Sequence, residues 1–62
     1  MPFVHIEIFE GRSVEIKRDL VTKLTDAVVD AIKCDRAAVR VVIQEMKKDN
    51  MAENGVLRID QE

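Results

Sequence analysis

Apolar and polar side chains alternate over residues 1–9. Val4, Ile6 and Ile8 fall on one side of an extended chain, and the other side carries Phe3, His5, Glu7 and Phe9. This period of two residues predicts a β-strand. One of its faces is wholly aliphatic, so we expect a helix to pack against it.

The pattern changes to a helical period over residues 14–33. Apolar side chains recur there at steps of three and four residues, at Leu20, Leu24, Ala27, Val28, Ala31 and Ile32. Ser13 stands before the first turn, where its hydroxyl can serve as the N-cap. Glu15 lies within that turn and complements the helix dipole. The sequence therefore predicts one amphipathic helix of about 20 residues, roughly 30 Å long.

A second strand and a C-terminal hairpin follow the helix. Residues 39–46 are rich in β-branched side chains and predict a second strand. The order strand, helix, strand implies a parallel pair with a right-handed crossover. Asn54-Gly55 separates two short runs, residues 51–53 and 56–59, which predicts a C-terminal β-hairpin. The expected fold class is therefore α+β, a β-α-β unit followed by a hairpin.

Length and composition predict an oligomer. A chain of 62 residues forms one small domain, and its single cysteine cannot close an intrachain disulfide. One histidine and one cysteine do not make a structural zinc site either, and the carboxylates show no metal-ligand spacing. Hydrophobic residues nevertheless make up 47% of the chain. A two-stranded sheet under one helix leaves open edges and one uncovered face, which other copies of the chain would cover.

Charge and hydropathy exclude several classes of protein. The net charge is −2, whereas a nucleic-acid-binding protein normally carries a basic excess. No apolar run is long enough to span a membrane, and we expect no signal peptide before the first strand. The lone cysteine and the lack of an export signal favour the cytoplasm.

Pro2 is the first candidate for chemistry. Removal of Met1 would leave the nitrogen of Pro2 as a free secondary amine. The pKa of an ordinary α-amino group is roughly 7.7–8.0, and apolar surroundings or nearby cations lower it, which would make this amine a base near neutral pH. Proline is also tolerated at a strand start for structural reasons alone.

Arg40 and Arg12 are candidates for binding an anion. Arg40 interrupts an aliphatic strand and shares its face with Val42 and Gln44. A guanidinium matches a carboxylate and can stabilise negative charge on an enolate oxygen. A solvated position on the strand is an equally good reading of Arg40, and loop arginines such as Arg12 are usually surface residues.

These residues together resemble a known family. A Met-Pro that opens a strand, the run Glu10-Gly11-Arg12-Ser13, one amphipathic helix and the strand over residues 39–46 are similar to the 4-oxalocrotonate tautomerase family, the short-chain members of the tautomerase superfamily. The resemblance covers essentially all of residues 1–62 as a single tautomerase-like domain. It implies a homohexamer, a trimer of dimers, with active sites built from more than one chain.

The resemblance also implies roles for individual residues. Pro2 takes the place of the family's catalytic general base, and Arg12 and Arg40 take the places of its substrate-binding arginines. Met51 stands where the family has an active-site aromatic, and Met51 and Phe9 are possible pocket-lining residues.

The implied function is a cofactor-independent keto–enol tautomerase. Its expected substrate is a small anionic, unsaturated 2-hydroxy or 2-oxo acid, such as a 2-hydroxymuconate-like dienol from aromatic catabolism. The main alternative is a non-catalytic oligomeric or ligand-binding module with the same fold, to which the altered stretch around Met51 gives weight. A third reading, also from the resemblance, is an enzyme in which the same proline acts in dehalogenation, decarboxylation or hydration. Neither metal, nucleic acid nor membrane is expected as a partner.

Overall fold

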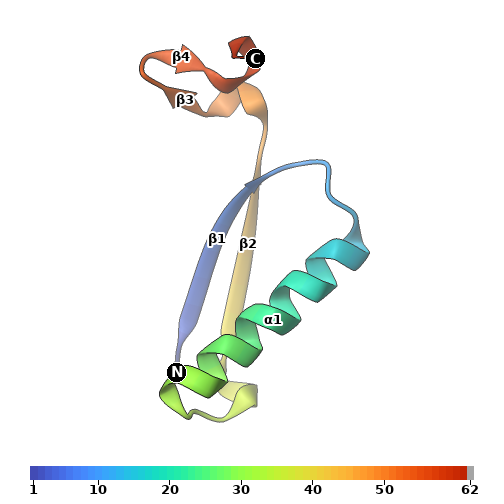
Figure 1. Cartoon of the computed structure of the whole chain (residues 1–62), viewed down its shortest axis with the longest axis vertical. Coiled ribbons are helices and arrows are strands. Elements are labelled where there is room, and N and C mark those ends of the chain that lie inside the picture. The colour runs from blue at the N-terminus through green and yellow to red at the C-terminus, as the bar shows by residue number, and fades with distance from the viewer. Residues whose placement is uncertain (62) are drawn as a thin grey trace.

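The computed structural model describes residues 1–61 as a β-α-β unit followed by a hairpin (Figure 1). The regular elements are β1 (Phe3–Phe9), α1 (Val14–Ile32), β2 (Arg40–Met46), β3 (Ala52–Glu53) and β4 (Val56–Leu57). Three 3₁₀ turns join them, η1 (Arg36–Ala38), η2 (Lys48–Asn50) and η3 (Arg58–Asp60). The predicted α+β architecture is confirmed, although the strands are one or more residues shorter than the sequence pattern predicts.

The main sheet consists of β1 and β2, paired in parallel. Phe3 lies opposite Arg40 and Phe9 lies opposite Met46. Exposure alternates along β1, as the period of two predicts: Val4, Ile6 and Ile8 are half-buried, while Phe3 is 63% exposed. Figure 1 shows α1 crossing one face of this sheet. The opposite face, which carries Phe3 and Arg40, has no covering element among the described residues.

Local interactions fix the ends of α1. The Ile16 N–H donates to Ser13 Oγ at 3.2 Å, which confirms the predicted N-cap. At the other end, Lys33 adopts a left-handed conformation (φ 58°, ψ 39°) and donates its N–H to the Val29 carbonyl. Left-handed backbone of this kind is usually supplied by glycine.

One ion pair ties the helix to the sheet. Lys17 Nζ on α1 lies 2.8 Å from Glu45 Oε1 on β2. The pattern of apolar positions places Lys17 outside the stripe, yet its side chain is only 27% exposed because it reaches over the sheet. Elsewhere on α1, a hydrogen bond from exposed Lys23 to Asp19 raises the pKa of Lys23.

The C-terminal hairpin extends beyond the end of the sheet, opposite the N-terminus (Figure 1). Its turn has positive φ at Asn54 (53°) and Gly55 (76°), as a type I′ turn requires. The Arg58 N–H donates to the Met51 carbonyl at 2.7 Å, which joins η3 to the base of the hairpin. The predicted Asn-Gly turn is therefore confirmed.

Residues 1–61 of a single copy form no buried core. None of residues 1–61 is buried, and the chain exposes 4873 Å². A compact monomer of this mass would expose about 4100 Å². The radius of gyration is 14.7 Å, against about 11 Å for a compact domain of this length. Within the described residues, no helix has the combined length and apolar character that crossing a membrane requires.

Candidate active site

Two of the predicted site residues meet at the N-terminal end of the sheet. The Arg40 N–H donates to the Pro2 carbonyl at 3.0 Å, one step beyond the Phe3–Arg40 pair. Pro2 is half-buried and Arg40 is exposed on the uncovered face. A parallel sheet brings these residues together because both stand where their strands begin. An arginine therefore lies next to the residue that Met1 removal would leave at the N-terminus.

The Arg40 side chain is held in place by the turn before β2. Its Nη1 donates to the Ala37 carbonyl at 2.8 Å. A guanidinium carries five N–H donors, so this bond leaves most of them available to an anion. The alternation predicted from sequence, with Arg40 on the face shared by Val42 and Gln44, agrees with the observed exposure.

The other predicted residues lie at the opposite end of the sheet. Phe9 ends β1, and the Arg12 Nη1 donates to its carbonyl at 3.1 Å. The Glu10 N–H donates to the Met46 carbonyl at 2.9 Å, which keeps the ends of β1 and β2 together. Met51 follows shortly after β2 and is half-buried. Phe9, Arg12 and Met51 thus belong to the carboxyl end of the parallel pair.

The length of β1 separates these two groups. The strand has seven residues, and at about 3.3 Å per residue its ends lie roughly 20 Å apart. The structure therefore brings Pro2 together with Arg40, and Arg12 with the end of β1, but it does not bring Pro2 and Arg12 together within one chain.

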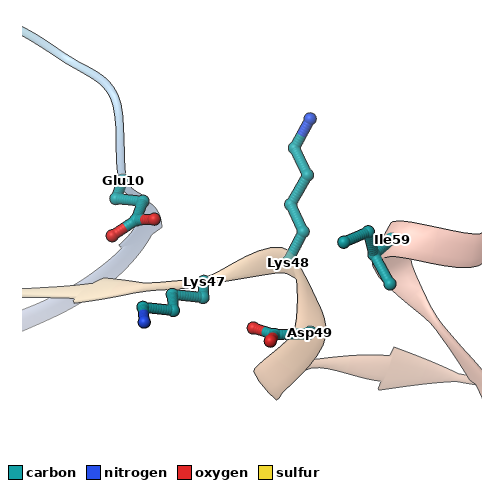
Figure 2. A pocket seen from close by; sticks show the side chains of 5 residues that line it. All are labelled: Glu10, Lys47, Lys48, Asp49 and Ile59. Atoms are coloured by element: carbon teal, nitrogen blue, oxygen red, sulfur yellow. The ribbon is translucent and has the colours of Figure 1, made fainter.

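A cavity that the sequence does not predict lies beyond the carboxyl end of the strands. It has a volume of about 400 Å³ and is lined by Glu10, Lys47, Lys48, Asp49 and Ile59 (Figure 2). Lys48 extends away from the chain between Glu10 and Ile59 (Figure 2). None of the four charged side chains forms an ion pair with another described residue. The lining comes from three separate segments without a common motif, so no sequence signal identifies it.

The remaining reactive side chains form no second site. His5 is exposed on the uncovered sheet face, and Cys34 is a half-buried free thiol beyond the end of α1. Among residues 1–61, no cluster of three or more histidine, cysteine, aspartate or glutamate side chains could hold a metal ion.

Comparison with known proteins gives consistent matches over nearly the whole chain. The family model described as "Tautomerase enzyme" matches residues 2–58. A probable tautomerase of Staphylococcus epidermidis is 44% identical over 61 residues, covering 98% of this chain and 100% of the relative. A probable tautomerase of Staphylococcus aureus is 43% identical over the same coverage.

Solved structures agree with the sequence matches. The crystal structure of YwhB, a homologue of 4-oxalocrotonate tautomerase, is 39% identical and superposes with a TM-score of 0.94 over 98% of this chain and 100% of its own. A heterohexameric 4-oxalocrotonate tautomerase from Chloroflexus aurantiacus is 31% identical, with a TM-score of 0.92 over 100% of both chains.

Proposed function

We propose a mechanism for this chain, which belongs to the tautomerase family and is a tautomerase. In this proposal, Pro2 is the general base and the substrate is a small unsaturated 2-hydroxy or 2-oxo acid. A 2-hydroxymuconate-like dienol from aromatic catabolism is the representative substrate. The reaction would take place in the cytoplasm.

The hydrogen bond between Pro2 and Arg40 is the observation that supports this proposal most directly. It fixes Pro2 just before β1, with its carbonyl oxygen 3.0 Å from the Arg40 backbone nitrogen. With Met1 removed, the Pro2 nitrogen would be a secondary amine, and an Arg40 guanidinium from this copy or a neighbouring one would lie close to it in the assembly. Positive charge nearby disfavours the protonated amine and lowers its pKa, so more of it is ready to accept a proton at neutral pH.

The proposed chemistry moves one proton. The Pro2 amine takes the proton from the 2-hydroxyl group, the O–H electron pair forms the C=O bond, and the conjugated double bonds shift. Pro2 then returns the proton to a carbon farther along the conjugated system. Atoms and electrons balance without an oxidant, reductant or cofactor.

The two arginines would bind the substrate. Arg40 would hold the carboxylate and the 2-oxygen, where its guanidinium stabilises the charge that develops on that oxygen. Arg12 would hold the far end of the substrate. The net charge of the chain is slightly negative, so attraction of an anion depends on these local cations.

A complete site of this kind needs a second copy of the chain. Pro2 and Arg12 stand at opposite ends of β1, so Arg12 of one copy would have to meet Pro2 of another. The exposed surface exceeds that of a compact monomer by roughly 800 Å², about what one partner buries in a standard interface. We propose a homohexamer, the state that best accords with the hexameric Chloroflexus aurantiacus relative.

Met51 distinguishes the proposed pocket of this chain, because the family has an aromatic residue at this position. Met51 is flexible and apolar, so it would adapt to a substrate rather than stack on it as an aromatic ring would. Together with Phe9 it would line the end of the pocket that holds the distal part of the substrate.

Replacement of Pro2 tests the proposed base. Pro2→Ala, or protein that retains Met1, should convert 2-hydroxymuconate to its keto isomer at least about 100-fold more slowly, because general base catalysis is lost. The change in ultraviolet absorbance of the dienol measures the rate. Cys34→Ala provides the control and should keep wild-type activity. Undiminished turnover in both altered proteins would contradict the proline-base mechanism.

A further inference from the structure

The orientation of Arg40 depends on a short turn, η1. The guanidinium of Arg40 donates to the Ala37 carbonyl at 2.8 Å. Two backbone bonds close this turn, from Ala38 N to the Asp35 carbonyl at 2.9 Å and from Val39 N to the Arg36 carbonyl at 3.2 Å. The position of η1 therefore sets the position of the Ala37 carbonyl and, through it, one side of the guanidinium.

An ion pair connects η1 to the helix. Arg36 Nη1 on the turn contacts Asp26 Oδ1 on α1. It is the only ion pair between α1 and η1 within the part of the chain that the structure describes. Lys33, in its left-handed conformation, lies where the chain leaves the helix. A side-chain link across this exit limits how far η1 can move relative to α1.

We propose that Asp26 and Arg36 are positioning residues for Arg40. The contacts run from the Asp26 carboxylate to the Arg36 guanidinium, through η1 to the Ala37 carbonyl, and from there to the Arg40 guanidinium. The inference rests on the substrate-binding role proposed for Arg40, and it holds whichever copy supplies the Pro2 that Arg40 serves. Neither Asp26 nor Arg36 touches the reacting atoms.

The expected effect is small and specific. The pair is half-exposed, with side-chain exposures of 54% for Arg36 and 59% for Asp26. Loss of such a pair should raise KM for a carboxylate substrate about two- to fivefold. The kcat value should fall by no more than about the same factor, because the Arg40 guanidinium is also proposed to stabilise the charge on the 2-oxygen.

The experiment compares matched ion pairs on the same helix. Asp26→Asn and Arg36→Gln should each raise KM for 2-hydroxymuconate, and the exchanged pair Asp26→Arg with Arg36→Asp should restore it. Asp19→Asn is the control, because it removes the partner of Lys23 from another exposed ion pair on α1. KM should be unchanged in this control.

A second measurement follows the motion of the Arg40 guanidinium and does not depend on turnover. Nuclear magnetic resonance of the Arg40 Nε–H group should show faster motion in Asp26→Asn than in Asp19→Asn. Equal motion in the two variants would overturn the inference.

Arg40→Gln separates the inference from the function on which it rests. If Arg40→Gln raises KM but Asp26→Asn and Arg36→Gln do not, the positioning role is wrong and the role of Arg40 stands. If Arg40→Gln leaves both KM and kcat unchanged, both are wrong. A rise in KM without restoration by the exchanged pair also counts against the positioning role.

Discussion

Lys33 shows how one residue can carry a local conformational cost. It occupies the left-handed region at the end of α1 without being glycine. A side chain with a Cβ atom costs roughly 1–2 kcal/mol there. Its contact with Asp30, at 3.9 Å and highly exposed, contributes little in return.

Lys33→Gly should therefore stabilise the fold. We expect a gain of about 0.5–1 kcal/mol in the free energy of unfolding, because glycine adopts this conformation without strain. Urea unfolding at fixed protein concentration measures it. Lys33→Ala is the matched control, since it removes the charge but keeps the Cβ atom, and it should show no gain. Equal stability of the two variants would contradict the strain explanation.

At the residue scale, sequence signals were reliable where the interaction is local. Ser13 caps the helix that begins one residue later, and its hydroxyl reaches only to Ile16. The ion pair of Lys17 was not predictable in the same way. Its partner Glu45 lies on β2, and the contact depends on how the helix crosses the sheet. No sequence signal predicts the left-handed conformation of Lys33 either, because the residue is not a glycine.

At the element scale, the hairpin depends on the backbone of its turn. Gly55 has a φ of 76°, and a Cβ atom added there would meet nothing within 4 Å. Any cost of a larger residue is therefore conformational and not a clash. The Asn-Gly pair made this turn predictable, whereas the lengths of β3 and β4 depend on pairing that the sequence does not specify.

Gly55→Ala should destabilise the chain by about 1 kcal/mol, because alanine resists positive φ. Gly55→Asn should cost less, since asparagine tolerates this region. Unfolding in urea, again at one protein concentration, compares the two variants. A loss as large for asparagine as for alanine would contradict the explanation from backbone conformation.

At the scale of the whole molecule, topology decides what can share a site. The strand–helix–strand order predicts that the starts of both strands lie together, and Pro2 and Arg40 do so. The cavity lined by Glu10, Lys47, Lys48, Asp49 and Ile59 was not predictable, because it depends on where η3 lies relative to β1. Alternation along a strand fixes its faces but not what covers them, so the full site could not be read from one chain's sequence pattern.

The separation of Pro2 from Arg12 leads to a prediction about mixed assemblies. Pro2→Ala and Arg12→Ala should each be nearly inactive alone. The two variants are then unfolded together and refolded as an equal mixture. If Arg12 of one copy serves Pro2 of another, about one quarter of the sites should be active, because these sites take Pro2 from an Arg12→Ala chain and Arg12 from a Pro2→Ala chain. The dienol assay measures the recovery, and the mass of the assembly is measured on the same sample.

The control mixes the two variants after each has been refolded separately, so that chains exchange only as fast as assemblies dissociate. Recovery should then be absent or slow. Because β1 holds its two ends roughly 20 Å apart, no rearrangement that keeps the strand intact can supply both residues from one chain. Joint refolding that yields assemblies of normal mass without activity would contradict the shared site, and so would a fully active monomer of 7.1 kDa.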